Sequence, residues 1–310
     1  MAERVLVTPR SMSRGPSLCL RMLEDAGYDL VIPSPGRQPT ETELVNSVEG
    51  VVGYVAGVEP ISERFLRAAS DLKAISRNGV GIENIDVSAA EALGVRVLRA
   101  EGANARGVAE LALLHILLLS RKSLPSIIGL KQHRWERVKG NELCGAKLGV
   151  FGMGSIGSLV AELAQSFGMI VSCYDPYPSS ETTAMDGLSW VSAGELWAES
   201  DIVTLHCPPQ ENGKPIVDRD ALSQAKSGLL LVNTARSALV DEEAVLEALE
   251  SDRLGGYSID AFAHEPPTDW RLVDHPNVIA TPHLGGFTEE SSRRAAEAAV
   301  RNLLQVLGEL

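Results

Sequence analysis

The feature that most constrains the fold is a glycine-rich turn between residues 148 and 157. Residues 148–151 have the composition of a buried strand, and glycines follow as Gly152, Gly154 and Gly157. This is G-x-G-x-x-G spacing after a strand, with a helical pattern behind it. The first glycine permits a tight turn, the second lets the backbone approach a pyrophosphate, and the third allows close packing of helix and strand. The segment predicts a dinucleotide-binding βαβ unit.

A second apolar run ends in Asp175, about 20 residues beyond the glycines, where such units carry an acidic residue. Its carboxylate can accept hydrogen bonds from both ribose hydroxyls, and its charge repels a 2′-phosphate. The phosphates would face the free N–H groups of the helix that begins at the turn. Glycines also mark ordinary turns, but the strand, the helix and Asp175 together disfavour that interpretation. We therefore predict NAD, rather than NADP, as the cofactor.

The size and charge of the chain limit its partners. Its 310 residues suffice for two domains with separate cores. A formal net charge of −13 argues against nucleic acid or an anionic membrane surface as the main partner. An anionic substrate would then need specific arginines. The longest apolar run, residues 108–119, is too short to span a bilayer.

The cysteines and the N-terminus favour a cytoplasmic protein. No C-x-x-C pair occurs, so neither a disulfide framework nor a metal site is indicated. The cysteines are Cys19, Cys144, Cys173 and Cys207. The chain enters a strand pattern within a few residues of its start, so we expect no signal peptide.

Short apolar runs alternate with helical patterns along the whole chain, as in parallel α/β proteins. In the first third, strands are predicted at 5–8, 30–33, 51–55, 72–76 and 95–98, and helices near 17–26, 41–47, 62–69 and 87–93. From residue 148 the alternation begins again, with strands predicted at 148–151, 170–174, 202–206, 229–232, 256–259 and 278–280. We predict two doubly wound parallel-sheet domains that face a cleft.

Two helix starts and one buried helix can also be predicted. Asp241 and Thr288 each precede acidic residues, as is typical of a helix N-cap. The pattern at 108–119 is apolar on most faces, which is typical of a buried helix. We expect it to pack at the hinge between the domains or against a partner subunit.

Three residues suited to redox chemistry follow strands in the second half. Arg236 follows the strand at 229–232, Glu265 the strand at 256–259, and His283 the strand at 278–280. Carboxyl ends of parallel strands share one edge of a sheet, where ligands of open α/β sheets bind. Oxidation of an alcohol needs a base such as histidine, which a carboxylate can orient, while arginine can bind a substrate carboxylate. Taken singly, each residue could instead be a surface or turn side chain.

Other histidines carry less information. His115 lies in the apolar helix and is most simply buried and satisfied. His206 ends a predicted strand near the expected cofactor, where it would contribute backbone and shape.

Several ordered motifs resemble the D-2-hydroxyacid dehydrogenases, and most closely the D-3-phosphoglycerate dehydrogenase branch in a short form without a regulatory extension. The resemblance covers nearly the whole chain. The motifs are 76–86, 102–110, 152–157, 233–236, 260–267 and 281–286.

The resemblance implies roles for the matching residues. His283 would be the acid/base, Glu265 its partner, and Arg236 the ligand of the substrate carboxylate and carbonyl. Substrate contacts would come from Arg77, Val80, Gly81, Asn104, Arg137 and Arg236. NAD contacts would come from Gly152, Gly154, Ser155, Ile156, Gly157, Asp175, His206, Cys207, Pro208, Thr234, Ala235, Arg236, Asp260, His283 and Gly285.

The resemblance also implies a discontinuous substrate domain of flavodoxin-like fold at 1–100 and 285–310. Residues 101–284 would form the Rossmann nucleotide-binding domain, which also makes the contact of a homodimer. One departure concerns the substrate tail, because the loop 55–59 has no cation where the family often has one. Asn78 and Ser237 are further departures.

We therefore expect an oxidoreductase for a small anionic D-2-hydroxy acid and its 2-keto acid. The candidates are 3-phosphoglycerate with 3-phosphohydroxypyruvate, or a hydroxypyruvate or phosphonate analogue. The alternative is an NAD-sensing regulator, since a corepressor group shares this scaffold. A formate-oxidising branch carries glutamine where this chain has Glu265.

Overall fold

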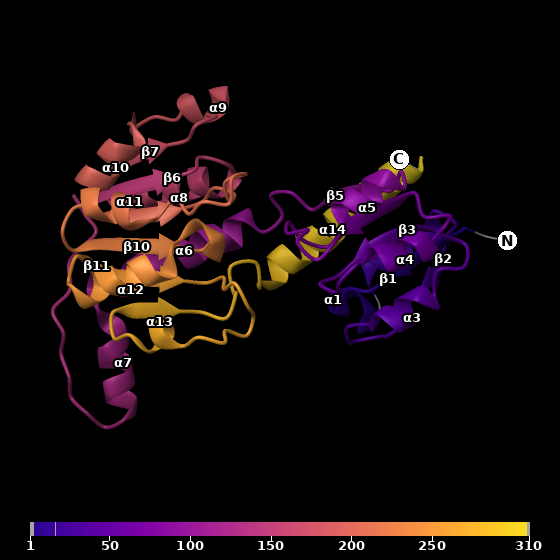
Figure 1. The fold of residues 1–310 in the computed structure, drawn as a ribbon, viewed down its shortest axis with the longest axis horizontal. Coiled ribbons are helices and arrows are strands. Elements are labelled where there is room, and N and C mark those ends of the chain that lie inside the picture. Colours follow the sequence, from indigo (N-terminus) through magenta and orange to yellow (C-terminus); the bar gives the residue numbers. More distant parts are fainter. Residues whose placement is uncertain (1–2, 16, 309–310) are drawn as a thin grey trace. The chain divides into compact units, whose positions relative to one another are not determined.

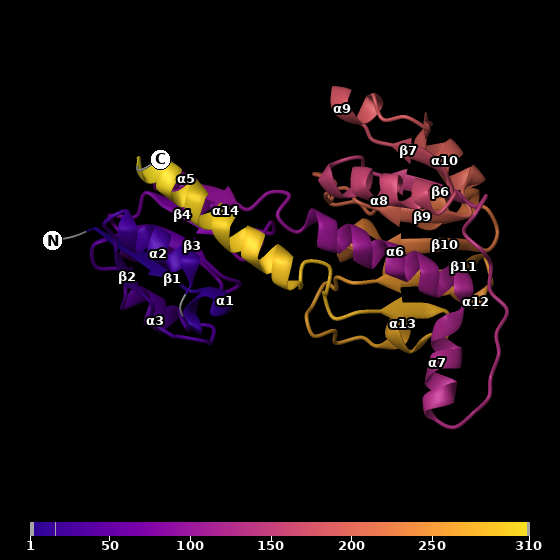
Figure 2. The same cartoon turned by 180° about the vertical axis from the view of Figure 1, so that it is seen from behind.

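The computed structural model describes residues 3–15 and 17–308, which fall into two compact units. The first unit comprises Met1–Asn104 and Thr288–Leu310, and the second comprises Ala105–Phe287. Each unit is a parallel sheet with helices on both faces, as Figure 1 and the view from behind in Figure 2 show. The predicted α/β class and the two parallel sheets are confirmed.

The sheet of the first unit has the strand order β2-β1-β3-β4-β5, and every pairing is parallel. Its strands are β1 (Arg4–Val7), β2 (Asp29–Val31), β3 (Val51–Ala56), β4 (Ala74–Arg77) and β5 (Arg96–Arg99). This is the flavodoxin-like order. The central strand β3 is buried along its whole length, as is typical of a strand with helices on both faces.

Several helices of the first unit begin at residues whose side chains cap them. Thr40 and Glu43 form a capping box, and Thr288 accepts a hydrogen bond from the Ser291 N–H, so that predicted helix start is confirmed. The last helix packs on β3, β4, β5 and α2. The helices are α1 (Arg10–Ser13), α2 (Leu18–Asp25), α3 (Glu41–Val45), α4 (Glu63–Ala68), α5 (Val87–Ala92) and α14 (Glu289–Leu307).

The sheet of the second unit has the strand order β12-β11-β10-β9-β6-β7-β8, again all parallel. The strands are β6 (Lys147–Phe151), β7 (Ile170–Tyr174), β8 (Leu188–Trp190), β9 (Ile202–Leu205), β10 (Leu229–Asn233), β11 (Leu254–Ile259) and β12 (Val278–Ala280). The chain runs outward from β6 to β8 and then returns to β9 on the other side of β6. This reversal is the switch point where open α/β sheets bind ligands, outside the carboxyl ends of the strands.

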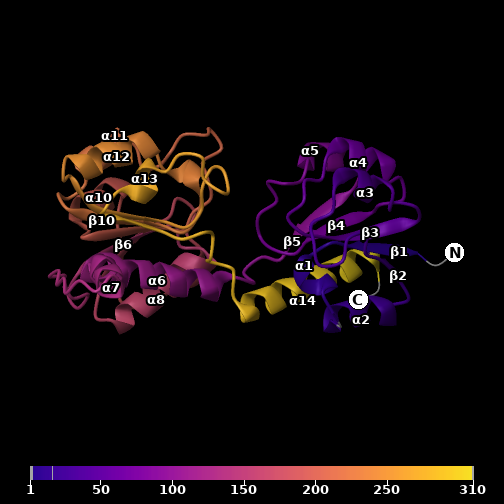
Figure 3. The same cartoon turned by 90° about the horizontal axis from the view of Figure 1, so that it is seen from below.

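The helices of the second unit cover both faces of its sheet (Figure 3). The α-helices are α6 (Ala105–Arg121), α7 (Ser123–Lys131), α8 (Ser155–Ser166), α9 (Ser180–Thr183), α10 (Ala193–Glu199), α11 (Arg219–Gln224), α12 (Glu242–Glu250) and α13 (Arg271–Asp274). A 3₁₀ turn, η1, spans Ser237–Leu239. Asp241 caps α12 by accepting a hydrogen bond from the Ala244 N–H, as predicted.

The apolar helix predicted at 108–119 is α6, and the second unit itself buries it. The helix packs on α8 and on strands β10, β11 and β12 of its own sheet. Much of its apolar surface is therefore buried within its own unit, and its packing at a hinge or against a partner subunit stays a prediction. Within the described residues no single helix is long and apolar enough to cross a membrane, and the pair α6–α7 that reaches the required length together is bent by 82°.

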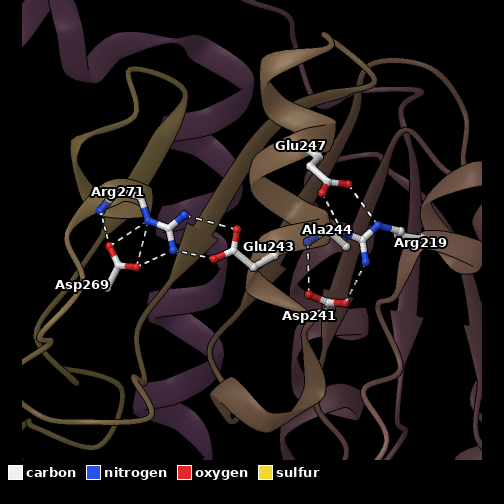
Figure 4. A network of polar contacts seen from close by, with 7 residues as sticks. All are labelled: Arg219, Asp241, Glu243, Ala244, Glu247, Asp269 and Arg271. Atoms are coloured by element: carbon white, nitrogen blue, oxygen red, sulfur yellow. Dashed lines mark hydrogen bonds and ion pairs between the residues drawn. The ribbon is translucent and has the colours of Figure 1, made fainter.

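Exposed ion pairs connect α12 to its neighbours (Figure 4). Arg219, at the start of α11, donates to Glu247 with Nε···Oε2 3.0 Å. Arg271 of α13 contacts both Glu243 of α12 and Asp269 of the preceding loop. All these side chains are more than half exposed, so each pair contributes little to stability.

Candidate active site

The glycine-rich turn has the close contacts that its sequence predicts. Gly152 has φ +94°, and a Cβ on it would lie 2.8 Å from the backbone nitrogen of Cys207. A Cβ on Gly157 would lie 1.9 Å from the carbonyl oxygen of Gly152. Any side chain at either position would therefore push α8 or the end of β9 away from β6.

The start of α8 can receive an anion. Gly154 is its N-cap, provides no capping side chain, and is exposed, with no atom within 4 Å of where a Cβ would stand. Ser155 is also exposed, and the first turn contains no acidic side chain. Free N–H groups at a helix start bind phosphate oxygens well. These residues fit the pyrophosphate of a dinucleotide.

Asp175 is held next to the glycine-rich turn. Its Oδ2 accepts a hydrogen bond from the Met153 N–H at 2.8 Å, and its Oδ1 accepts one from the Tyr177 N–H at 2.8 Å. These bonds fix the half-buried carboxylate at the end of β7, beside β6. A carboxylate fixed there fits the ribose of the adenosine half of NAD.

The ends of β9 and β10 contribute His206, Cys207 and Thr234. The His206 Nε2 lies 2.8 Å from Thr204 Oγ1, and burial of the ring lowers its pKa to about 3, so the ring is neutral at pH 7. Burial raises the pKa of Cys207 to about 11, which keeps its sulfur as the thiol. In the described part of the chain, His206 Nδ1 and Thr234 Oγ1 are buried without a hydrogen-bond partner. The neighbouring Pro208 is exposed and Ala235 is half-buried.

Asn233 holds the turn that carries Arg236. Its Oδ1 accepts a hydrogen bond from the Ala235 N–H at 3.0 Å, and its Nδ2 donates to the Arg236 carbonyl at 2.8 Å. The Arg236 guanidinium donates through Nη1 to the Ala235 carbonyl at 2.9 Å and is half-buried. Sequence reasoning missed this role of Asn233, although a polar residue at the end of a buried strand is a recognisable signal.

Glu265 and His283 form a direct pair. The His283 Nδ1 lies 2.8 Å from Oε1 and 3.0 Å from Oε2 of Glu265. Both side chains remain accessible, at 50% for His283 and 42% for Glu265. A carboxylate in contact with Nδ1 can accept its proton, which would leave Nε2 as the ring nitrogen open to a ligand. Arg236, Glu265 and His283 follow β10, β11 and β12, which are adjacent in the sheet.

Asp260 anchors the turn that carries His283. Its buried carboxylate accepts hydrogen bonds from the N–H groups of Leu284 at 2.7 Å and Gly285 at 2.8 Å, and from Thr281 Oγ1 at 2.6 Å. His283 itself has φ +53° and donates its N–H to the Asp260 carbonyl at 2.9 Å. The sequence placed Asp260 among the cofactor contacts and did not predict that it fixes this strained turn.

The interpretation of His115 as a buried, satisfied side chain is confirmed. Its ring nitrogens contact the hydroxyls of Ser258 and Thr281, the latter at 3.3 Å. Burial lowers the pKa of this histidine.

The predicted substrate-binding residues belong to both units. Arg77, Val80 and Gly81 lie at the end of β4 and in the turn that follows it, and Asn104 is the last residue of the first unit before α6. Arg137 is exposed on a stretch of irregular backbone in the second unit. Their contact with one common ligand remains a prediction.

Comparison with known sequences identifies the family. Residues 113–285 match the family described as D-isomer specific 2-hydroxyacid dehydrogenase, NAD binding domain. Human D-3-phosphoglycerate dehydrogenase is 35% identical over 90% of this chain, although the chain spans only 52% of that protein. Hydroxypyruvate reductase of Thermotoga maritima is 37% identical over 86% of this chain and 88% of the relative.

Solved structures agree with this assignment. The TT0316 protein of Thermus thermophilus has a TM-score of 0.86 and 34% identity, covering 98% of this chain and 96% of its own. A D-lactate dehydrogenase of Aquifex aeolicus, solved with NAD and lactic acid, has a TM-score of 0.80 and 26% identity, covering 99% and 96%. Together with the glycine-rich turn and the fixed Asp175, these matches identify the second unit as an NAD-binding domain. This chain belongs to the D-isomer specific 2-hydroxyacid dehydrogenases.

Proposed function

We propose that the protein is an NAD-dependent oxidoreductase that interconverts a small anionic D-2-hydroxy acid and its 2-keto acid. The observation that carries the proposal is the contact between Glu265 and His283 Nδ1 at the strand edge of an NAD-binding domain. The pair lies on strands adjacent to the one that presents Arg236. A base, its carboxylate partner and a cation for the substrate are the groups that this reaction requires.

His283 transfers the proton of the reaction. In the direction of oxidation, Nε2 accepts the hydroxyl proton of the substrate, and Glu265 stabilises the imidazolium that results. In the direction of reduction, Nε2 returns that proton to the carbonyl oxygen. NAD, when bound, supplies the nicotinamide that accepts or donates the hydride.

Arg236 binds and orients the substrate. A guanidinium can donate two parallel hydrogen bonds to a carboxylate, and it also polarises the neighbouring carbonyl oxygen. Val80 and Gly81 are proposed as backbone donors to the same carboxylate, and Arg77, Asn104 and Arg137 as further substrate contacts. The cofactor would be held by the glycine-rich turn, by Asp175, and by the ends of β9 to β12.

The substrate proposed is 3-phosphohydroxypyruvate with 3-phosphoglycerate, or a hydroxypyruvate or phosphonate analogue of these. The support is the named activity of the two sequence relatives, a D-3-phosphoglycerate dehydrogenase and a hydroxypyruvate reductase. The four free cysteines also support a cytoplasmic location.

We also propose a homodimer formed through the second unit. Large apolar side chains in one stretch of α6, α7 and the following loop are 44–83% exposed: Leu114, Ile127, Ile128, Leu130, Trp135 and Val138. Such a concentration is typical of an interface. Leu130→Glu should convert the dimer to a monomer in light scattering, whereas Phe167→Glu, at an exposed apolar site after α8, should not.

A turnover screen with NADH tests the proposed activity. The compounds are 3-phosphohydroxypyruvate, hydroxypyruvate, glyoxylate and phosphonate analogues, with NADH absorbance as the readout. The proposal expects oxidation of NADH with at least one of them and formation of the D-hydroxy acid. If NAD binds but no 2-keto acid is reduced, the NAD-sensing alternative is favoured instead.

A further inference from the structure

Three loops of the first unit meet at the carboxyl edge of its sheet. They follow β1, β3 and β4, which are neighbours in the sheet. The Asn78 N–H, after β4, donates to the Ala56 carbonyl at the end of β3 at 2.9 Å. The Asn78 Nδ2 lies 3.5 Å from Ser11 Oγ in α1, directly after β1. The proposed substrate-binding turn at 78–81 therefore adjoins the loop after β1, in which the short helix α1 carries Arg10 and Ser11.

The loop after β3, residues 57–59, contains the carboxylate of Glu59 and no lysine or arginine. Glu59 is only 1% exposed, and its Oε1 accepts hydrogen bonds from the Tyr54 hydroxyl at 2.7 Å and the Gly57 N–H at 2.8 Å. Thr8 donates to the same oxygen. These bonds fix the carboxylate within the unit. A positive charge for an anionic ligand must therefore come from another loop.

The end of β4 carries polar groups that lack partners. Within the described residues, Ser76 Oγ, Arg77 Nε and Asn78 Oδ1 are buried and make no hydrogen bond. Buried polar atoms without partners are rare, and three in consecutive residues are exceptional. Arg77 donates through Nη1 to the Asn78 carbonyl, so its guanidinium is held at this edge. Ser76 is fully buried within β4, so a polar ligand at this edge could satisfy only the open groups of Arg77 and Asn78.

Arg10 is the cation that the neighbouring loop supplies. It is exposed, directly precedes Ser11, and forms no ion pair with any residue in the described ranges 3–15 and 17–308. In a chain of net charge −13, an arginine without a carboxylate partner beside a proposed substrate turn is available for an anion.

We propose that Arg10 is the second cation, with Arg77, of a site for a phosphate or phosphonate group on the substrate tail. The inference rests on the proposed function and assigns a specificity-determining residue to it. Arg10 takes the place of the cation that is missing from the loop 55–59. Ser11 follows Arg10 in sequence and Asn78 follows Arg77, and the contact of 3.5 Å between Asn78 Nδ2 and Ser11 Oγ brings the two segments together with polar atoms for the same group.

Arg14 provides a matched control. It belongs to the same loop, is exposed, and also lacks an ion pair within the described residues. Its side chain packs instead against Gly36, with Cγ 3.5 Å from where a Cβ would stand. Gly36 follows β2, on the side of β1 away from β3 and β4. Arg14→Met therefore removes the same charge without touching the proposed site.

The test compares two substrates that differ only in the tail. With 3-phosphohydroxypyruvate, Arg10→Met should raise KM by about 10- to 100-fold, the range for loss of a charged hydrogen bond, with little change in kcat. In Arg10→Met, KM for hydroxypyruvate should stay unchanged. Arg14→Met should alter KM for neither substrate. Arg10→Lys, which keeps the positive charge, should raise KM for 3-phosphohydroxypyruvate less than Arg10→Met does. An equal rise for both substrates, or no difference between the two methionine variants, would overturn the proposal.

A binding measurement separates this proposal from the proposed activity. If the wild-type protein reduces no 2-keto acid, calorimetric titration with 3-phosphoglycerate still decides whether the site exists. Binding by wild type and Arg14→Met, weakened at least tenfold in Arg10→Met, would support the site. No binding, or the same affinity in all three proteins, would contradict it.

Discussion

Glu265 contacts His283 Nδ1 through both carboxylate oxygens, at 2.8 Å and 3.0 Å. The contact joins the end of β11 to the end of β12 and leaves the imidazole accessible. It therefore orients the imidazole and leaves Nε2 as the ring nitrogen open to a ligand.

Replacing Glu265 with Gln should lower kcat/KM by about 100-fold with the preferred 2-keto acid. The amide can donate to Nδ1 and so stabilise the wrong tautomer, and it carries no charge to stabilise the imidazolium. The control is His264→Ala, at the exposed neighbouring residue, which should keep full turnover. Equal activity of Glu265→Gln and wild type would show that the contact plays no part in proton transfer.

Asp260→Asn should reduce both stability and activity. The carboxylate accepts three hydrogen bonds from the His283 turn, and an amide cannot accept at both of its ends. We expect a loss of about 1–3 kcal/mol in the free energy of unfolding, measured by urea denaturation. Hydrogen exchange at Leu284 and Gly285 should accelerate at the same time. Unchanged exchange at these amides would remove Asp260 from its role as the anchor.

Asp175→Ala should weaken NAD binding and reduce discrimination against NADP. The substitution removes the acceptor for the ribose hydroxyls and the charge that repels a 2′-phosphate. Titration by protein fluorescence should show the Kd for NAD rising about tenfold, the equivalent of one moderate charged hydrogen bond, and the Kd for NADP falling. Asp186→Asn, at an exposed aspartate after α9, is the control. Equal affinity of the wild-type protein for both cofactors would contradict the cofactor assignment.

The half-buried His206 should make the protein less stable in mild acid. Its pKa is about 3 in the folded protein and about 6.5 in an unfolded chain, so between these values only the unfolded state binds the proton. The free energy of unfolding therefore falls as the pH drops from about 6.5 towards 3, by at most about 1.4 kcal/mol per pH unit. His115, whose pKa burial also lowers, contributes with the same sign.

Urea denaturation at pH 5 and pH 7 measures this dependence. His206→Asn should show a smaller difference in the free energy of unfolding between the two pH values than wild type. His133→Asn, at an exposed histidine with φ +61° that asparagine tolerates, should retain the full difference. The same pH dependence in all three proteins would show that His206 is not the group responsible.

The architecture and the strand ends that carry the proposed catalytic residues could be predicted from the sequence because both depend on local patterns. Most strands could be predicted from apolar runs with flanking turn residues. Arg236, Glu265 and His283 were selected as candidates because each follows such a run. The strand β8 was missed because it is a three-residue edge strand with half-exposed side chains. Strand β4 begins at Ala74 rather than Leu72, since the apolar pattern continues into the preceding loop.

The residues that hold the site in place could not be predicted in the same way. The anchoring role of Asp260 depends on donors 21 to 25 residues away, and the burial of the Glu59 carboxylate depends on Thr8, which follows another strand. A carboxylate in a loop looks the same in sequence whether it is solvated or buried. Only tertiary structure distinguishes the two cases.

The central claim is that His283 transfers the proton in NADH-dependent reduction of a 2-keto acid. The most direct measurement is kcat/KM of wild type and His283→Ala with the preferred substrate, together with the Kd for NADH. We expect His283→Ala to lose about 10²- to 10⁴-fold in kcat/KM while its affinity for NADH is preserved. Near-full turnover by His283→Ala, with a folded protein that still binds NADH, would contradict it.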